Sequence, residues 1–385
     1  MRALFLSYAY ERGLVADAGG FRKLWEIAAA LKRLGHEVLV LYPKLPGHGP
    51  LTPVPCRAYP VLDLPLLRPL TAYVSMVGGA LAVGRRLRPD IVYFRSDLNV
   101  LPLLLKPGLG TRVVLEVNAD ALEFLGREGA HPLRREMFRF AEALNARRSD
   151  VIVVLTPGLK EMLVARYGIA PEKVQVVPSG TDPTHFAPEE PARARQRIGL
   201  DPDRPVVGFV GLFYRHQGVP TLLEALARLR ATVPKLGCLI VGDGLMRPAW
   251  EALAHRLGIA DAVRFPGQVP YRNVPTYLNA LDVVVAPFTA DRGETSPFKI
   301  LDALACGRPV IASDLPSVRS LAEGTRAVTL VPPEDPEALA GAIETLLADP
   351  DRRRTMGAEG RQFVVARHGW DRIAERLLAA LEGRA

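Results

Sequence analysis

Two carboxylates eight positions apart flank the start of a predicted helix in the last third of the chain. Glu294 precedes this helix, and Asp302 lies a little over two turns into it. Apolar residues at i, i+3 and i+4 spacing predict the helix itself. Thr295 and Ser296 are suitable N-cap residues, and Pro297 suits the first turn. Carboxylates so placed can accept hydrogen bonds from the hydroxyl groups of a sugar.

The amino end of that helix is also a candidate anion site. Its unpaired backbone N–H groups and the positive end of the helix dipole favour a phosphate or diphosphate between the two acids. For this stretch by itself, the alternative interpretation is an ordinary amphipathic helix with a good cap and two solvated acids. The remainder of the chain therefore has to decide between the two interpretations.

Length and composition limit the remaining possibilities. A chain of 385 residues fits two domains of roughly 180 residues each. Its 49% hydrophobic and 23% charged residues are typical of a globular protein and exclude disorder. Three scattered cysteines without a CxxC pair, and no secretory signal, indicate a reducing compartment. No Cys/His cluster predicts a metal, and we expect Asp201-Pro-Asp203 and Asp349-Pro-Asp351 to be loop turns.

The positive charge is concentrated in the first half. Residues 1–182 carry 24 basic and 17 acidic residues, a net +7, whereas residues 183–385 carry 25 and 24, a net +1. This excess favours an anionic partner such as lipid headgroups or an acidic acceptor, and a solvated basic surface explains it equally well. The candidate surface helix is 133–148. The apolar run 64–83 is interrupted and falls short of about 20 clean apolar residues, so we expect a core helix there.

Strand-like and helical segments alternate along both halves, which predicts mostly parallel sheets covered by helices. Between the halves, residues 178–205 are dense in Pro, Gly, Asp and Arg and are typical of a linker. In the first half a buried stripe ending at Leu34, with Gly35 as its cap, marks a helix. The expected strands are 3–8, 38–42, 90–94, 112–117, 150–156, 174–178, 206–211, 236–244, 262–267, 282–288 and 310–313.

The motifs resemble those of the retaining glycosyltransferase family 4, most clearly over 206–313. The stretch from Glu294 to Asp302 resembles the family's E-x7-E element, with Asp302 in the second position and the SPFK run of a variant subgroup. The resemblance implies the α/β GT-B fold, in which two Rossmann-like doubly wound domains face across a cleft. We expect an acceptor-side domain at 1–182, joined by a crossing helix at 366–385, and a nucleotide-sugar domain at 183–365.

The same resemblance implies the site residues. Glu294 should hold the donor sugar and Asp302 the ribose, while the amides of residues 296–300 hold the diphosphate. Gly19, Gly20 and Asn118 should lie beside the phosphate and the acceptor. The predicted catalytic residues are Glu294 and Asn118, and the predicted donor-binding residues are Gly19, Gly20, Arg215, Gln217, Gly242, Thr295, Ser296, Pro297, Phe298, Lys299, Ile300 and Asp302.

Three positions depart from the family pattern. Leu212 and Gln217 stand where relatives carry the Arg and Lys that grip the diphosphate. We expect Arg215 and Lys299 to replace them; the alternative is a leaving group held mainly by backbone amides. Asn118 follows a buried strand at the place where many relatives carry a histidine. Because an amide takes no proton, general-base catalysis by Asn118 is excluded, although Asn118 can bond a sugar hydroxyl.

These features together predict a metal-independent, cofactor-free hexosyltransferase with retention of configuration. The donor is a nucleoside-diphosphate sugar and the acceptor a glycan or lipid-linked hydroxyl of the cell envelope. We expect a cytoplasmic enzyme at the inner face of an anionic membrane, with no nucleic-acid partner. The alternatives are an epimerase, which would need no acceptor, a phosphorylase, which would need free phosphate, and a non-catalytic protein that binds an anionic surface.

Overall fold

The computed structural model describes residues 1–7, 19–46, 48–64, 67–127, 129–294, 296 and 298–383. The chain divides into two compact units. The first unit comprises Met1–Ser179, Gly293–Ser296 and Trp370–Ala385, and the second comprises Gly180–Arg292 and Pro297–Gly369. The main division therefore falls at Ser179/Gly180, three residues before the expected boundary. Helix α15 (Trp370–Leu381) belongs to the first unit.

In the described part of the first unit, seven strands form one sheet in the order β3-β2-β1-β4-β5-β6-β7. Every neighbouring pair is parallel. Runs rich in Val, Ile and Leu suit these strands because both faces of a parallel sheet are buried. The strand order reverses between β1 and β4. The strands are β1 (Arg2–Leu6), β2 (Glu37–Lys44), β3 (Cys56–Pro60), β4 (Ile91–Arg95), β5 (Arg112–Val117), β6 (Val151–Val154) and β7 (Val174–Val176).

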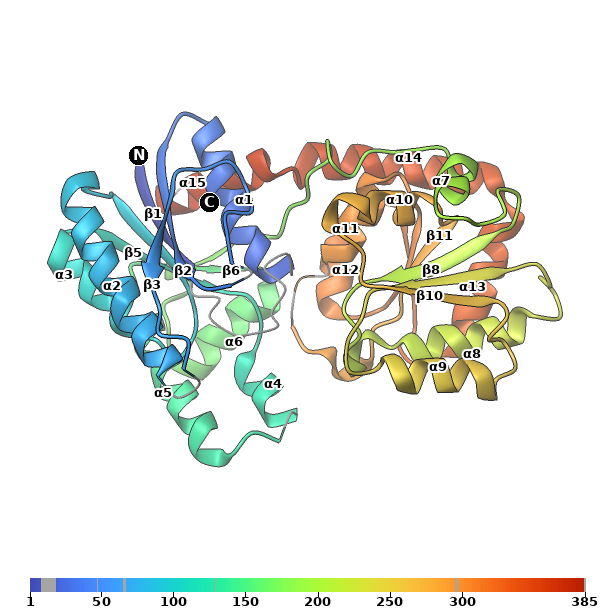
Figure 1. The fold of residues 1–385 in the computed structure, drawn as a ribbon, viewed down its shortest axis with the longest axis horizontal. Helices are drawn as coiled ribbons and strands as arrows, with labels where there is room; N and C mark the ends of the chain where they lie inside the picture. Colours follow the sequence, from blue (N-terminus) through green and yellow to red (C-terminus); the bar gives the residue numbers. More distant parts are fainter. Residues whose placement is uncertain are drawn as a thin grey trace. The chain divides into compact units, whose positions relative to one another are not determined.

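Helices cover this sheet on both faces (Figure 1). α2 (Arg68–Leu87) and α6 (Pro157–Tyr167) share one core with alternate residues of the strands. α1 (Gly19–Arg33) packs on α15 and on β2. α3 (Leu105–Leu109) lies against α2, and α4 (Ala121–Arg127) against α5 (Pro132–Arg148).

Most expected elements are present, with small corrections. Gly35 has a φ of +85° and ends α1 as expected. Leu34, expected in the buried stripe, is 37% exposed because it lies beyond the last helical turn. The apolar run 64–83 becomes α2, which begins only at Arg68. No helix in the described ranges is long and apolar enough to cross a bilayer.

The described part of the second unit repeats the topology with six parallel strands in the order β10-β9-β8-β11-β12-β13. Here the order reverses between β8 and β11. In open parallel sheets, ligands bind outside the carboxyl ends of the strands at such a reversal. The strands are β8 (Val206–Val210), β9 (Gly237–Val241), β10 (Val263–Gly267), β11 (Val283–Ala286), β12 (Val310–Ser313) and β13 (Val328–Val331).

Alternate strand residues of the second unit point to opposite faces of the sheet and pack in two separate hydrophobic cores. One core receives α8 (Val219–Leu229), α9 (Arg247–Arg256) and α13 (Pro336–Ala348). The other receives α10 (Val274–Asn279), α11 (Phe298–Ala305) and α14 (Pro350–Arg367). Asp349 caps α14 by accepting a hydrogen bond from the Arg352 N–H at 2.9 Å, so the expectation of a loop turn at 349–351 is wrong. α7 (Pro191–Arg197) and α12 (Pro316–Ala322) complete the unit.

Candidate nucleotide-sugar site

Two glycine turns meet at the carboxyl edge of the second sheet. Gly211 follows β8 and Gly242 follows β9, and the Gly211 N–H donates to the Val241 carbonyl at 2.9 Å. A Cβ added to Gly242 would lie 1.9 Å from the Gly211 oxygen, and the φ of Gly242 is +131°. Only glycine fits such an approach of two backbones. The predicted residue Gly242 therefore shapes the edge of the sheet beside the strand reversal.

Lys299, the second residue of α11, reaches this edge from the other side of the reversal. Its ammonium donates a hydrogen bond to Gln217 Oε1. The same nitrogen lies 3.8 Å from the centroid of the Phe209 ring and 5.2 Å from that of Phe288. A Cβ on Gly211 would approach it to 2.7 Å. The fold thus places the Lys299 ammonium beside Gln217, the position where relatives are expected to carry a lysine.

The surroundings of Lys299 favour binding of an anion. Burial, and secondarily the positive charge of Arg292, lower the pKa of Lys299 well below its ordinary value of 10.5. The Arg292 guanidinium lies 4.0 Å from the centroid of the Phe288 ring and Lys299 Nζ lies 5.2 Å from it, so both cations lie close to the same ring. An anion between them would relieve their mutual repulsion. Arg292 was not among the predicted residues, although it opens the same stretch, seven positions before Lys299.

Arg215, the other predicted replacement cation, has a different setting. It begins a 3-10 turn, η3 (Arg215–Gln217), and its guanidinium pairs with Asp291 at 2.6 Å. The Arg215 side chain is 77% exposed, and Leu212 is also exposed. Of the two predicted cations, the structure brings only Lys299 to Gln217.

Helix α11, which follows β11 and the turn η5 (Ala290–Arg292), carries or follows most of the remaining donor residues. Asp302, in the middle of α11, accepts a hydrogen bond from Thr181 Oγ1 at 2.5 Å. Phe298 is the first described helical residue, Ile300 packs in the core and Ser296 is buried. Thr295, one of the two predicted cap residues, and Pro297, predicted in the first turn, lie outside the described residues.

Glu294 groups with the first unit and not with α11. Its Oε2 accepts a hydrogen bond at 2.8 Å from Thr156 Oγ1, just beyond the carboxyl end of β6. Thr156 also caps α6 by accepting from the Leu159 N–H at 3.2 Å. Glu294 therefore forms this hydrogen bond within the first unit, whereas Asp302 forms its hydrogen bond with Thr181 within the second.

A buried polar cluster lies at the end of β5 in the first unit. Asn118 is 7% exposed, and neither atom of its amide has a hydrogen-bond partner among the residues that the structure describes. Two residues earlier, Glu116 Oε1 lies 2.8 Å from Lys23 Nζ, and both side chains are fully buried. Because Lys23 sits in the first turns of α1, this ion pair fixes the start of that helix beside β5. Gly19 and Gly20 open α1.

The charges of this cluster shift each other's titration. Burial lowers the pKa of Lys23, although the attraction of Glu116 opposes the shift. Burial alone would raise the pKa of Glu116, but the charges of Lys23 and Arg95 outweigh it, so that this pKa falls below its usual value. Burial and the Glu116 charge raise the pKa of Tyr93. Lys23 and Glu116 thus form a buried ion pair. Glu116 lies two residues before Asn118 in the sequence, whose amide has no partner among the described residues.

Among the described residues, no three His, Cys, Asp or Glu side chains gather in a way that could hold a metal ion. The polar groups at the two sheet edges are instead ammonium, guanidinium, amide and carboxylate groups. Such groups can bind and orient phosphates and hydroxyls, and they can stabilise the charge of a departing diphosphate.

Two family models match most of the chain. The model described as "Glycosyltransferase Family 4" matches residues 19–185, and "Glycosyl transferases group 1" matches residues 192–363. The D-inositol 3-phosphate glycosyltransferase of Stackebrandtia nassauensis is 35% identical over 60% of this chain and 54% of its own length. The chain thus spans about half the length of such relatives. The alpha-D-kanosaminyltransferase of Streptomyces kanamyceticus is 28% identical over 89% of this chain and 93% of its own.

Solved structures share the architecture over the whole chain. Sucrose-phosphate synthase from Thermosynechococcus elongatus has a TM-score of 0.80 and 24% identity, covering 99% of this chain and 98% of its own. Anabaena HepE in complex with UDP and glucose has a TM-score of 0.77 and 21% identity, covering 99% of both chains. These similarities confirm the expected pair of Rossmann-like domains of the GT-B fold. On the two matching family models, the chain belongs to the family 4 glycosyltransferases.

Proposed function

We propose that this protein transfers a sugar from a nucleoside-diphosphate sugar to an acceptor hydroxyl and retains the anomeric configuration. The observation that carries the proposal is the ammonium of Lys299 at the strand reversal of the second sheet, bonded to Gln217 and close to Arg292. A diphosphate seated there would contact two cations and the amino end of α11. The HepE structure is a complex with UDP and glucose, so a uridine nucleotide is the first probe.

Each donor group has its own role in this proposal. The second unit holds the diphosphate through Lys299, Arg292 and the backbone N–H groups of residues 298–300, while Asp302 bonds the ribose. Glu294 orients hydroxyls of the donor sugar. Arg215 is left to its ion pair with Asp291.

The chemistry proposed here needs no protein base. A phosphate oxygen of the leaving diphosphate accepts the proton of the acceptor hydroxyl, as the acceptor oxygen bonds to the anomeric carbon and the glycosidic C–O bond to phosphate breaks. Both events take place on the same face of the sugar, so configuration is retained. Lys299 and Arg292 stabilise the diphosphate charge that develops. Neither a metal nor a cofactor is required by these steps.

Asn118 is assigned to the acceptor. Its amide is buried and makes no hydrogen bond among the described residues, and a polar group in that state gains from a ligand hydroxyl. Asn118→Ala should therefore lower kcat/KM for transfer by about tenfold, with nucleotide binding unchanged. A change in nucleotide binding instead would show that the acceptor assignment is wrong.

The acceptor class is a glycan or lipid-linked hydroxyl used in cell-envelope synthesis, and the place of action is the cytoplasmic side of an anionic membrane. The basic first unit supports this part of the proposal, because residues 1–182 carry a net charge of +7. A lipid-linked acceptor would present its hydroxyl at such a surface.

The test is nucleotide binding by Lys299 variants. A thermal-shift panel of UDP, GDP, ADP and dTDP sugars should identify one base, since a ligand at 100 times its Kd adds about 2.7 kcal/mol of stability. Lys299→Met should abolish most of that shift, and Lys299→Arg should keep part of it. Lys235→Met is the matched control, because Lys235 is exposed and lies in the turn before β9, at the amino edge of the same sheet. Equal shifts for Lys299→Met and wild type would overturn the donor assignment.

Incubation of the preferred donor without an acceptor separates the alternative activities. A transferase leaves the nucleotide sugar largely intact until an acceptor hydroxyl is added. Interconversion of the sugar in the absence of acceptor would indicate an epimerase, and a requirement for free phosphate would indicate a phosphorylase.

A further inference from the structure

Helix α5 of the first unit has two apolar faces, and only one of them is buried in the fold. The buried face carries Phe138, Ala141, Asn145 and Ala146. Because successive residues turn by about 100°, the opposite side carries Leu133, Met137 and Phe140 at i, i+4 and i+7. These three side chains are 64%, 54% and 70% exposed. We call this row the α5 stripe.

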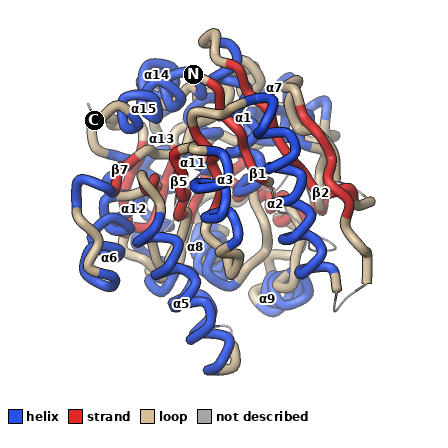
Figure 2. Tube along the Cα trace, turned by 90° about the vertical axis from the view of Figure 1, so that its left-hand side faces the viewer, coloured by secondary structure: helices blue, strands red, loops and turns tan. Residues whose placement is uncertain are grey.

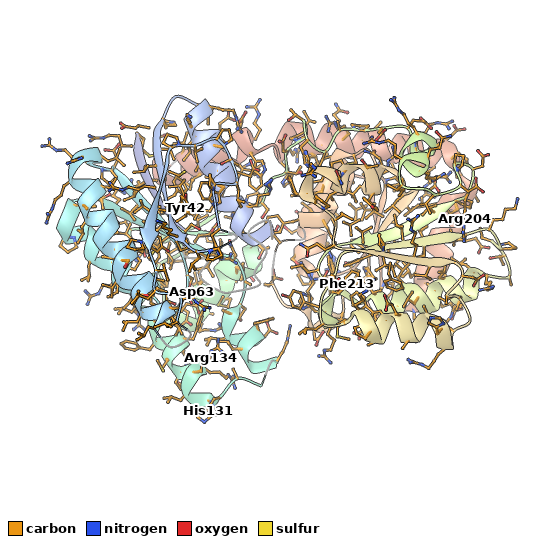
Figure 3. The ribbon with its side chains drawn as sticks, viewed as in Figure 1. Tyr42, Asp63, His131, Arg134, Arg204 and Phe213 are labelled. Carbon is orange, nitrogen blue, oxygen red and sulfur yellow. The ribbon has the colours of Figure 1, made fainter. Side chains whose placement is uncertain are left out.

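The α5 stripe extends to the free end of the helix. Figure 3 shows His131 and Arg134 at the lower end of the first unit, where α5 begins after α4. Figures 1 and 2 both show this end of α5 reaching beyond the strands of the sheet. From Leu133 to Phe140 the stripe spans about 10 Å along the helix axis. Nothing else in the described part of the first unit covers it.

Basic side chains surround the α5 stripe. Arg134, Arg147 and Arg148 are exposed on α5 itself, and Arg139 pairs with Glu136. Among the exposed residues of α5, Glu136 is the sole acid. Such a surface matches an anionic bilayer. The apolar side chains can enter the layer of acyl chains, while the arginines contact the phosphate headgroups above it. A dimer through this face would place like charges against each other, which disfavours a second copy as the occupant.

We propose that the α5 stripe is the membrane-docking surface of this protein, with Leu133, Met137 and Phe140 entering the headgroup layer of an anionic bilayer. The inference deepens the membrane contact in the proposed function and rests on that function for the choice of a lipid partner. Docking through the first unit would hold a lipid-linked acceptor at the unit that carries Asn118.

The test is sedimentation of the full chain with vesicles of phosphatidylcholine alone or mixed with equal parts of phosphatidylglycerol. Wild type should sediment with the mixed vesicles at low salt and much less at high salt, where screening is strong. The triple variant Leu133→Ser, Met137→Ser and Phe140→Ser should lose at least about tenfold in partition coefficient. Changing Arg134, Arg147 and Arg148 to Gln should cost about fivefold per arginine at low salt.

The matched control removes exposed aliphatic side chains from the second unit. Leu245→Ser together with Val365→Ser should sediment as wild type does, since these residues lie outside the proposed surface. Thermal shift with the preferred nucleotide checks that every variant is folded. A wild-type protein that ignores anionic vesicles, or a triple variant that sediments like wild type, would refute the docking surface.

Two further outcomes separate this inference from the others. If light scattering shows a dimer that the triple variant dissociates, the stripe binds a second copy and the membrane proposal is wrong. If wild type sediments through the stripe but binds no nucleotide sugar, the docking surface stands and the proposed function falls.

Discussion

The ammonium of Lys299 donates a hydrogen bond to the side-chain oxygen of Gln217, a residue 82 positions earlier in the chain. Gln217 ends the turn after β8, and Lys299 lies in the first turn of α11, so the bond spans the reversal of strand order in the second sheet. Family 4 relatives are expected to carry a lysine where this chain has Gln217. The ammonium of Lys299 on α11 can therefore replace the lysine that is expected in the turn at position 217.

A charge-swap experiment tests this replacement. Lys299→Met should weaken nucleotide binding by about 1.5–3 kcal/mol, roughly 10- to 150-fold, because a charged hydrogen bond to phosphate is lost. Adding Gln217→Lys to that variant should recover most of the affinity, measured by calorimetric titration. Gln217→Lys in the wild-type background should give no gain, since two adjacent ammonium groups repel each other. Failure of the double variant to recover would mean that the two positions are not equivalent.

Nucleotide affinity should also depend on pH through Lys299. The pKa of this lysine is well below 10.5 in the free protein, and a bound diphosphate would raise it. Between the free and bound pKa values, binding takes up a proton, so affinity falls as pH rises and is constant below the free pKa. Titrations across the alkaline range in two buffers of different ionisation enthalpy should reveal this uptake. Lys299→Arg should flatten the profile, because arginine stays charged throughout.

The helix around Lys299 and Asp302 was predicted because helix period is a local signal, and α11 confirms that helix. Their partners Gln217 and Thr181 lie 82 and 121 positions away, and only the fold brings them together. Glu294 was expected just ahead of the helix, at a different depth from Asp302. The structure groups Glu294 with the first unit, where it accepts a hydrogen bond from Thr156.

The fold was predictable for a simpler reason. Strands buried on both faces read as continuous apolar runs, and β4, β5, β8 and β11 were each found in this way. Strand β3, with the sequence CRAYP, was missed because it lies at the edge of the sheet and is only partly buried. Arg292 was overlooked because its role depends on its position near the Phe288 ring and Lys299, and no local sequence signal gives that position.

The close approach of two glycine turns makes Gly242 intolerant of a side chain. Gly242→Ala should abolish the nucleotide-induced thermal shift and destabilise the second unit by about 1–3 kcal/mol, since the φ of +131° is strained for alanine and its Cβ would strike the Gly211 oxygen. Gly341→Ala is the control. It lies in α13 with open space around it, and alanine should stabilise that helix by about 0.5–1 kcal/mol. Equal behaviour of the two variants would contradict the packing described at Gly242.

The buried pair in the first unit should govern its local stability. Glu116→Gln leaves the ammonium of Lys23 buried without its counter-charge, which typically costs about 3–5 kcal/mol. Hydrogen exchange of β5 should rise accordingly, while β9 in the second unit serves as the internal reference. Replacing both residues, as Lys23→Met with Glu116→Leu, should cost much less because no lone charge remains.

This loss should shrink in acid. The pKa of Glu116 is lowered in the folded protein, so the carboxylate contributes stability above the unfolded value of about 4.3 and loses it as pH falls through the folded pKa. The amide introduced by Glu116→Gln does not titrate, and the gap in stability between wild type and this variant should therefore narrow below that pH. A gap that stays constant down to strongly acidic pH would mean that Glu116 is not charged in the folded state.

The variant Glu294→Ala should separate nucleotide binding from sugar transfer. In the proposed function its carboxylate orients hydroxyls of the donor sugar and does not hold the nucleotide, so Glu294→Ala should leave UDP or GDP affinity nearly unchanged. Transfer should fall to less than about a tenth of wild type, because a charged hydrogen bond worth about 1.5–3 kcal/mol is lost.

Glu344→Ala, on the exposed face of α13, is the matched control and should transfer normally. Thr156→Val removes the donor to Glu294 Oε2 together with the side-chain cap of α6, and thermal unfolding measures the stability lost with that cap. This variant should lower transfer less than Glu294→Ala, since the carboxylate remains available to the sugar. If Glu294→Ala keeps more than about a tenth of wild-type transfer, its carboxylate has no role in the reaction, and its hydrogen bond to Thr156 only fixes the loop against the first unit.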